Sequence, residues 1–149
     1  ALVNQHLNGI KKVLSLEDTL PITIPGQDNV KKRSMMWLSS KLIIATPQVV
    51  RNDIVNEILD PKKFTLIIFD EAHHCIGKHA MAQVGKLYNS KIEKPLVLAM
   101  TASPGASTGQ VEEICRNLKL ERIYLKSPND PMLSRYLSNS ILLISLQTI

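Results

Sequence analysis

A short apolar run that ends in two carboxylates constrains this 149-residue chain more than any other stretch. Residues 64–69, read FTLIIF, are rich in β-branched and aromatic side chains. Such a composition predicts a strand that is buried on both faces of a parallel sheet. Asp70 and Glu71 follow where this strand should end. Because ligands of open α/β sheets bind beyond the carboxyl ends of the strands, this acidic pair indicates the first candidate site.

The acidic pair has the chemistry that nucleotide hydrolysis requires. One carboxylate can hold Mg²⁺, usually through its waters, and the next can accept a proton from an attacking water molecule. The simpler alternative is an acidic strand end followed by a turn, with His73 as a surface residue. Residues 70–73, read DEAH, leave both interpretations open when they are taken alone.

Length, charge and cysteine content limit the classes of protein to consider. The chain is long enough for one domain with a real core and too short for two ordinary ones. Its 18 Lys and Arg against 13 Asp and Glu give a net charge of +5, which is compatible with a phosphate-backbone partner. No apolar run approaches the roughly 20 residues that span a bilayer, so no membrane partner is expected. Cys75 and Cys115 form no CxxC pair, which favours a reducing, intracellular compartment.

The remaining pattern predicts alternating strands and helices. Apolar residues at helical spacing predict helices over residues 1–15, 28–39, 46–59, 80–90 and 107–118. Short apolar runs predict strands over residues 22–24, 41–45, 64–69, 95–100 and 121–125. This alternation is typical of an α/β fold with a parallel sheet and flanking helices.

Two further segments place polar residues at the ends of predicted strands. Thr46 and Pro47 predict the start of a helix, with threonine at the N-cap and proline at the first helical position. The free N–H groups and the positive dipole end of such a helix bind phosphate readily, although a purely structural cap explains the pair equally well. Residues 101–104, read TASP, follow the predicted strand 95–100.

These segments together resemble the motifs of one protein superfamily. DEAH at 70–73 resembles motif II, the Walker B box, of superfamily 2 helicases and translocases. TPQ at 46–48 is similar to motif Ib, and TASP at 101–104 is similar to motif III. Residues 2–6, the Arg33 to Trp37 spacing, ATPQ and MTASPG most resemble the branch of archaeal Hef, Fanconi-anaemia M and Mph1 translocases, which remodel forked and branched DNA.

The resemblance implies a RecA-like, P-loop NTPase-type domain over residues 1–126, truncated at its N-terminal side, and an exit segment over residues 127–149. It implies ATP and Mg²⁺ as cofactors, with the metal held by Asp70 through water and with Glu71 as general base. It implies that His73, Thr101 and Ser103 couple hydrolysis to movement. The nucleic-acid contacts that it implies are Gln5, Gly26, Thr46, Pro47 and Gln48.

Two motifs of the family are absent from this sequence. No G-x-x-x-x-G-K-[ST] phosphate loop occurs in the 149 residues, and neither does the arginine-bearing motif VI of a second motor domain. We therefore expect a fragment that carries half of an ATPase site and is inactive alone, with the phosphate-loop segment and a second RecA-like domain as its partners. In the family the phosphate-loop strand lies beside the motif III strand, so its absence should leave an edge open to pairing.

We expect the parent protein to be an ATP-dependent DNA helicase or translocase that acts on forked or branched DNA in repair or recombination. An RNA-directed ATPase of the Dicer and RNA-sensor branch is an alternative within the superfamily. A non-catalytic nucleic-acid-binding fragment is an alternative from another class. The expected location is the cytoplasm in an archaeon and the nucleus in a eukaryote.

Overall fold

A computed structural model describes residues 8–9, 22–103, 107–126 and 142–146 of the chain. They fall into two compact units, which divide between Asp60 and Pro61. Residues 8–9 are helical, but the rest of the predicted helix over residues 1–15, including Gln5, lies outside the described residues.

Between residues 22 and 60, the first unit contains a small parallel pair of strands with two helices. β1 (Ile22–Thr23) pairs with β2 (Ile43–Ile44), and α2 (Val30–Ser39) connects them. α3 (Pro47–Val55) follows β2. β2 is shorter than the strand predicted over residues 41–45, and although that apolar run is typical of a buried strand, both residues of β2 are only half-buried. Among the described residues, the two-residue β1 is the one strand that pairs with β2, so little of β2 is shielded from solvent.

Both helices of the first unit begin at residues that cap them. The side chain of Asn29 accepts a hydrogen bond from the backbone N–H of Lys32 at 2.8 Å, before α2. The Thr46 hydroxyl accepts one from the N–H of Val49 at 3.4 Å, and Pro47 occupies the first turn of α3. The capped helix start predicted at Thr46 is therefore confirmed.

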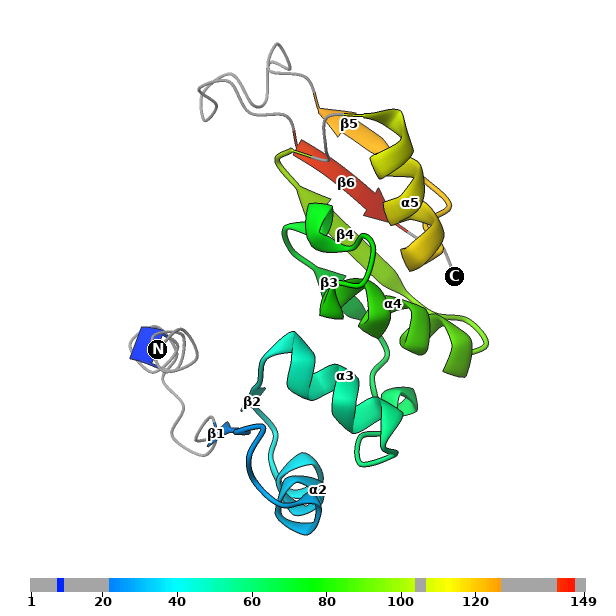
Figure 1. Ribbon diagram of the computed structural model, residues 1–149. Helices are drawn as coiled ribbons and strands as arrows, with labels where there is room; N and C mark the ends of the chain where they lie inside the picture. Colours follow the sequence, from blue (N-terminus) through cyan, green and yellow to red (C-terminus); the bar gives the residue numbers. More distant parts are fainter. Residues whose placement is uncertain (1–7, 10–21, 104–106, 127–141, 147–149) are drawn as a thin grey trace. The chain divides into compact units, whose positions relative to one another are not determined.

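The second unit is built on a four-stranded sheet with the order β3-β4-β6-β5 (Figure 1). β3 (Ile67–Phe69) and β4 (Val97–Thr101) are parallel and are joined by α4 (Ala80–Lys91). α5 (Thr108–Leu118) follows β4 and leads to β5 (Tyr124–Lys126). β6 (Leu142–Leu146) runs antiparallel to both β4 and β5. Two short 3₁₀ turns, η1 (Pro61–Lys63) and η2 (Ala72–His74), flank β3.

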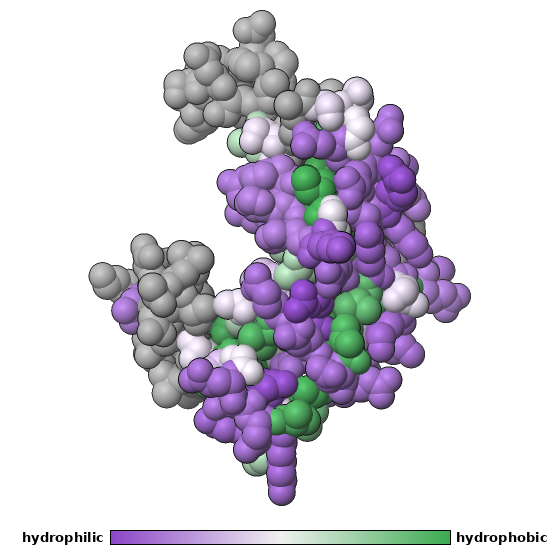
Figure 2. Space-filling model, in the orientation of Figure 1, coloured by the Kyte–Doolittle hydropathy of each residue, from purple (hydrophilic) through white to green (hydrophobic). Residues whose placement is uncertain are grey.

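One face of this sheet carries the core of the unit. α4 and α5 lie on that face (Figure 1), and their outer sides are largely hydrophilic (Figure 2). The strands contribute Phe69, Val97 and Ala99 to it, and the helices contribute Val84, Tyr88, Ile114 and Leu118, all buried. The helix predicted over residues 107–118 therefore turns its apolar residues Ile114 and Leu118 to this core. The spacing of Ser107 and Gln110 in the sequence is that of a capping box, but the Ser107 side chain at the N-cap of α5 makes no capping hydrogen bond.

The apolar run at β3 differs from its prediction. Phe69 is buried, but Phe64, Leu66 and Ile68 are 45%, 42% and 52% exposed. Alternate residues of a strand point to opposite faces, so Ile68 lies on the side away from the buried Phe69, while Phe64 and Leu66 precede the strand. β3 is also an edge strand of the described sheet. The prediction of burial on both faces is therefore wrong for the described part of the chain.

The C-terminal part of the chain adds a strand that the sequence pattern did not predict. β6 pairs with β4 along the edge opposite β3, from Leu98 opposite Leu146 to Thr101 opposite Leu143. This is the edge at which the resemblance implies the phosphate-loop strand. The division into a domain over residues 1–126 and an exit segment over residues 127–149 stays a prediction. Within that exit segment, the structure describes β6, which belongs to the sheet.

Candidate functional site

The candidate site lies where β3 and β4 end at the same edge of the sheet. β3 ends at Phe69, which is in register with Ala99 of the parallel strand β4. Asp70 and Glu71 follow β3 directly, and Thr101 is the last residue of β4. Parallel strands present their carboxyl ends together, which brings the two sequence segments to one place. Both carboxylates are exposed, whereas Thr101 is buried.

His73 connects Glu71 to Thr101. Its Nδ1 atom lies 3.2 Å from Oε2 of Glu71 and 3.0 Å from Oγ1 of Thr101. The His73 side chain is 30% exposed and the Glu71 side chain is 58% exposed. The structure therefore brings together three of the predicted site residues, which are separated by up to 30 positions in the sequence.

One ring nitrogen thus serves two partners. In a neutral imidazole, a nitrogen either carries one hydrogen and donates it, or carries a lone pair and accepts. When Nδ1 carries hydrogen, it can donate to the Glu71 carboxylate or to the Thr101 oxygen. When Nδ1 carries the lone pair, only the Thr101 hydroxyl can donate to it, and the contact with Glu71 has no hydrogen. The hydroxyl of Thr101 therefore competes with the carboxylate of Glu71 for His73.

The backbone at Glu71 is left-handed. Its φ and ψ angles are 51° and 48°, a conformation that is costly for a residue with a Cβ atom. Local hydrogen bonds support it: Oδ1 of Asp70 accepts from the Glu71 N–H at 2.9 Å, and the Glu71 carbonyl accepts from the N–H of His74 at 3.0 Å. Unfavourable backbone angles at a strand end are frequent at functional sites.

Helix α5 anchors the segment that follows the DEAH residues. The Asn117 side chain donates to the carbonyl of Cys75 at 2.8 Å within the core, and Oε1 of Glu113 accepts from the N–H of Gly77 at 2.8 Å. Gly77 has a φ of 55°, which glycine adopts without a steric cost. Sequence reasoning missed these anchors. The available signal was the position of Asn117, a polar residue directly before Leu118 on the apolar face of its helix.

The other predicted coupling residue, Ser103, contacts Thr101 through its backbone. Its N–H donates to Oγ1 of Thr101 at 3.2 Å, while its side chain is exposed. Pro104, the last residue of the TASP segment, lies outside the described residues. The hydroxyl of Thr101 is therefore held from both sides, by His73 and by the backbone two residues later.

A second group of predicted residues gathers in the first unit, beyond the carboxyl ends of β1 and β2. The N–H of Ile24 donates to the carbonyl of Ile44 at 3.1 Å, so the two chains remain paired up to the turn at Gly26 and the start of α3. A Cβ atom on Gly26 would lie 3.3 Å from a methyl group of Val49. Pro47 and Gln48 are exposed at the first turn of α3.

The histidines and cysteines near the site do not form a metal site. Among the described residues, no group of three or more His, Cys, Asp or Glu side chains could hold a metal ion. Burial raises the pKa of Cys75 to about 12, and it also raises the pKa of Cys115, so both remain neutral thiols at ordinary pH. No helix within the described ranges is long and apolar enough to cross a membrane.

Asp70 and Glu71 nevertheless fit a hydrated Mg²⁺ ion. Mg²⁺ usually keeps several waters and takes one or two carboxylates from the protein, rather than a cage of protein ligands. Two exposed carboxylates at the end of a strand meet that requirement. The donors are oxygen atoms, which magnesium prefers to the nitrogen and sulfur ligands of the neighbouring residues.

Comparisons with known proteins give a consistent picture. The model of the family described as type III restriction enzyme, res subunit, matches residues 1–106. The crystal structure of the helicase domain of Pyrococcus furiosus Hef is similar with a TM-score of 0.75 and 32% sequence identity, over 93% of this chain and 29% of that chain. That similarity confirms the predicted RecA-like α/β fold.

Two curated relatives align over nearly the whole chain. A protein of Methanocaldococcus jannaschii, named putative ATP-dependent RNA helicase, is 39% identical over 92% of this chain and 17% of its own length. The ATP-dependent DNA helicase mph1 of Sclerotinia sclerotiorum is 30% identical over 91% of this chain and 11% of its own length. The chain therefore spans only a small part of the curated relatives that it matches.

Proposed function

The chain belongs to the family described as type III restriction enzyme, res subunit, within the Hef and Mph1 branch of superfamily 2, and from this premise we propose that it forms the greater part of a motor domain that couples ATP hydrolysis to movement along DNA. The contact of His73 with both Glu71 and Thr101 carries this proposal. It links the candidate catalytic base to the end of the neighbouring strand. We assign forked or branched DNA as the substrate.

The residues of this chain divide the chemistry between them. Asp70 would hold Mg²⁺ through water, and the ion would offset the negative charge of the nucleotide phosphates. Glu71 accepts the proton of the attacking water, which its exposed carboxylate can reach from the strand end. A phosphate loop and a second motor domain, supplied outside these 149 residues, would complete the site.

Coupling follows from the competition at His73. When Nδ1 donates to Glu71, it orients the carboxylate and lowers its ability to accept another proton. When the same Nδ1–H donates instead to Oγ1 of Thr101, Glu71 is released to act on water, and no proton has to leave the ring. A displacement of residues 101–103 by a moving nucleic-acid strand would therefore reach the catalytic base through a single imidazole. Ser103, through its N–H bond to Thr101, belongs to the same linkage.

The surface at Gly26, Thr46, Pro47 and Gln48 is assigned to the phosphate backbone of the strand. Pro47 has no N–H and the Val49 N–H is bonded to Thr46, so the N–H of Gln48 is the donor at the start of α3 that can reach a phosphate oxygen, and the helix dipole favours negative charge there. For Gln5, a contact with the same nucleic-acid strand is proposed from its sequence motif alone. The net charge of +5 agrees with an anionic partner.

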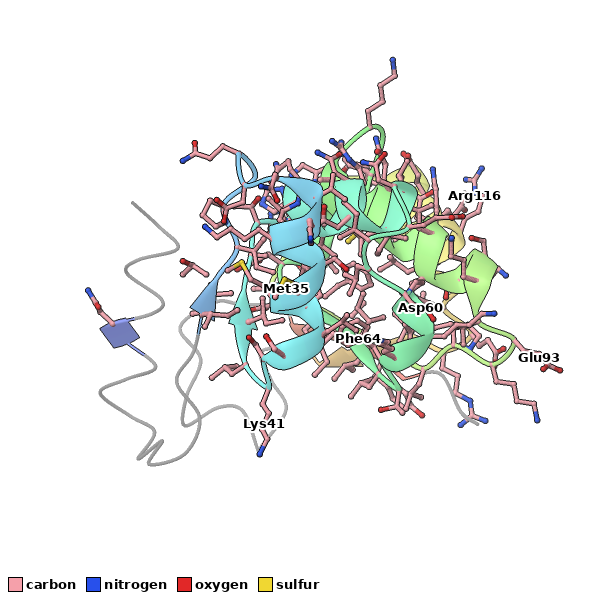
Figure 3. All side chains as sticks on the ribbon, turned by 90° about the horizontal axis from the view of Figure 1, so that it is seen from below. Met35, Lys41, Asp60, Phe64, Glu93 and Arg116 are labelled. Atoms are coloured by element: carbon pink, nitrogen blue, oxygen red, sulfur yellow. The ribbon has the colours of Figure 1, made fainter. Side chains whose placement is uncertain are left out.

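ATP hydrolysis in the presence and absence of forked DNA tests the proposal. We expect the chain alone to be inactive and a longer natural form that includes a phosphate loop to be stimulated by DNA. In that longer form, Glu71→Gln should reduce hydrolysis by about 10²–10⁴-fold. Glu93→Gln is the matched control, because Glu93 is exposed and extends away from the fold (Figure 3).

Each result has a defined meaning. Full activity of Glu71→Gln would remove Glu71 as the base, and stimulation by neither nucleic acid would indicate a non-catalytic binding fragment. Stimulation by RNA and not by DNA would assign the protein to the RNA-directed branch. The name of the Methanocaldococcus jannaschii relative makes this RNA comparison necessary.

A further inference from the structure

Asp53, in the last half of α3, is a buried carboxylate with a complete set of donors. Its side chain is 1% exposed. Nε and Nη2 of Arg33 each lie 3.0 Å from its Oδ1, and Nε1 of Trp37 donates to Oδ2 at 2.8 Å. Both donors come from α2. The ion pair therefore fixes α2 against α3 at one point.

The same arginine also reaches the turn that follows β1. Nη1 of Arg33 donates to the carbonyl of Gly26 at 3.3 Å and to the carbonyl of Asp28. The turn is closed by a hydrogen bond from the N–H of Asp28 to the carbonyl of Pro25 at 3.2 Å. A planar guanidinium can serve a carboxylate on one edge and carbonyl groups on the other, which a lysine ammonium cannot. Arg33 thus joins Asp53 to the 25–28 turn.

This turn lies directly against the start of α3. A Cβ atom on Gly26 would be 3.3 Å from Val49, which belongs to the first turn of that helix. Any shift of the turn would therefore change the distance between Gly26 and the backbone N–H groups after Thr46. Arg33 and Asp53 themselves are poorly placed to bind a ligand, because their side chains are only 12% and 1% exposed.

Stability alone gives a weak reason for such a pair. Burying two charges costs desolvation energy that their mutual attraction often only balances, and apolar side chains of similar volume can replace such pairs without loss. What apolar side chains cannot provide is a directional link to two carbonyl groups of a turn. The contacts of Arg33 therefore favour a role in geometry.

We propose that Arg33, held by Asp53 and Trp37, is a positioning residue that sets the spacing between Gly26 and the start of α3 for a nucleic-acid backbone. This inference rests on the proposed function, because it assumes that the two segments contact one strand. It assigns no direct contact with nucleic acid to Arg33. It predicts that loosening the turn weakens binding even when the fold and the net charge are unchanged.

The test is the substitution Arg33→Lys in the full chain, with two measurements. Hydrogen exchange at the Asp28 amide reports the turn without any ligand, and we expect it to be at least several-fold faster in the variant. Binding of labelled forked DNA across a salt series reports the interface. We expect weaker binding at every salt concentration with an unchanged salt slope, because Arg33→Lys keeps the charge and the groups that it positions carry none.

Two controls separate positioning from general damage. Arg116→Lys makes the same chemical change at an exposed residue of α5 (Figure 3) and should alter neither measurement. Ile54→Val weakens the core beside Asp53, since Ile54 is 3% exposed, but keeps every contact of Arg33. It should lower the unfolding temperature and leave the affinity for DNA unchanged. A merely structural role for Arg33 would give the same pattern as Ile54→Val.

The outcomes distinguish the inference from the function on which it rests. Unchanged exchange at Asp28 in Arg33→Lys would overturn the link between Arg33 and the turn. Faster exchange with unaltered affinity would overturn the positioning role while DNA binding stands. If the unmodified chain binds neither DNA nor RNA at low salt, the proposed interface is wrong and the positioning role falls with it, whatever the exchange shows.

Discussion

Two carboxylate sites of this molecule have opposite surroundings. In the first unit, Asp53 is buried and receives hydrogen bonds from Arg33 and Trp37. In the second unit, Asp70 and Glu71 are exposed, and Glu71 has left-handed backbone angles. The described contacts of Asp70 and Glu71 are with the neighbouring backbone and with one histidine. One carboxylate is fully used by the protein itself, and the other two keep lone pairs for a ligand.

The contrast shows that residue type alone does not identify a functional acid. A buried charge must be paired, so its partners are fixed and it serves the fold. An exposed charge on a strained backbone contributes little to the stability of the fold, so a role in ligand binding or catalysis explains its position better. The proposals for the two units follow from this difference, and substitutions in both units can test it.

The largest expected effect is on stability, from Asp53→Ala compared with Asp70→Ala. Removing Asp53 leaves the guanidinium of Arg33 and the indole N–H of Trp37 without their shared acceptor, which should cost about 3–5 kcal/mol. Asp70→Ala should change the free energy of unfolding by no more than about 0.5 kcal/mol, as expected for an exposed residue. Urea denaturation of the two variants measures both. Equal costs would show that the comparison between the two sites is mistaken.

A smaller effect is expected at the buried hydroxyl of the candidate site. Thr101→Val removes the partner of His73 Nδ1 and the acceptor of the Ser103 N–H, and should cost about 2–3 kcal/mol. Thr101→Ser keeps the hydroxyl and should cost less. In the longer form that hydrolyses ATP, Thr101→Val should abolish the stimulation of hydrolysis by DNA, whereas Thr101→Ser should retain it. Equal stimulation in both variants would exclude Thr101 from coupling.

The features that could be predicted from sequence are those that depend on neighbouring residues. The order of strands and helices, the cap at Thr46 and the acidic end of β3 follow from local pattern and spacing. The burial of Phe64, Leu66 and Ile68 was predicted wrongly, because local composition does not reveal which face of a sheet is covered. The family resemblance identified the spacing of Arg33 and Trp37, but their common partner is determined by the packing of α2 on α3.

Long-range contacts account for the rest of the difference. The bond from Asn117 to Cys75 spans 42 positions, and β6 joins β4 from a segment more than 40 residues further along the chain. Neither has a local signal, since each depends on which surfaces meet in the folded state. The left-handed conformation of Glu71 is also invisible in the sequence, because glycine or asparagine is the usual residue at such angles.

Two buried amides extend the comparison from charges to neutral polar groups. Asn117 donates to the Cys75 carbonyl, whereas the side-chain oxygen and nitrogen of Asn89 have no hydrogen-bond partner among the described residues. Asn117→Leu should therefore cost about 1–2 kcal/mol, because the carbonyl loses its donor. Asn89→Leu should be nearly neutral or stabilising. Thermal unfolding of the two variants compares their stability. If Asn89→Leu loses more stability than Asn117→Leu, the presence of a hydrogen-bond partner does not determine the energetic cost of the substitution.

The smallest expected effect separates strain that serves function from strain that does not. Glu71 and Lys119 both have left-handed backbones, with φ angles of 51° and 53°. Lys119 ends α5, where glycine is the usual residue, and its side chain donates to the carbonyl of Asn89 at 3.3 Å. Glycine relieves the steric cost of the left-handed conformation at either position. It also makes the unfolded chain more flexible, which lowers the stability of the folded state. Each substitution should therefore stabilise the protein by at most about 1 kcal/mol.

The two glycine variants should therefore agree in stability and differ in activity. In a form that hydrolyses ATP, Lys119→Gly should keep the activity, because Lys119 is remote from the carboxyl ends of β3 and β4. Glu71→Gly should lose it, because the carboxylate that accepts the proton is gone. Steady-state hydrolysis and urea denaturation on the same preparations give both values. A clear loss of stability in Glu71→Gly alone would mean that the contact with His73 outweighs the backbone strain, and Glu71 would then resemble Asp53 as a residue of the fold.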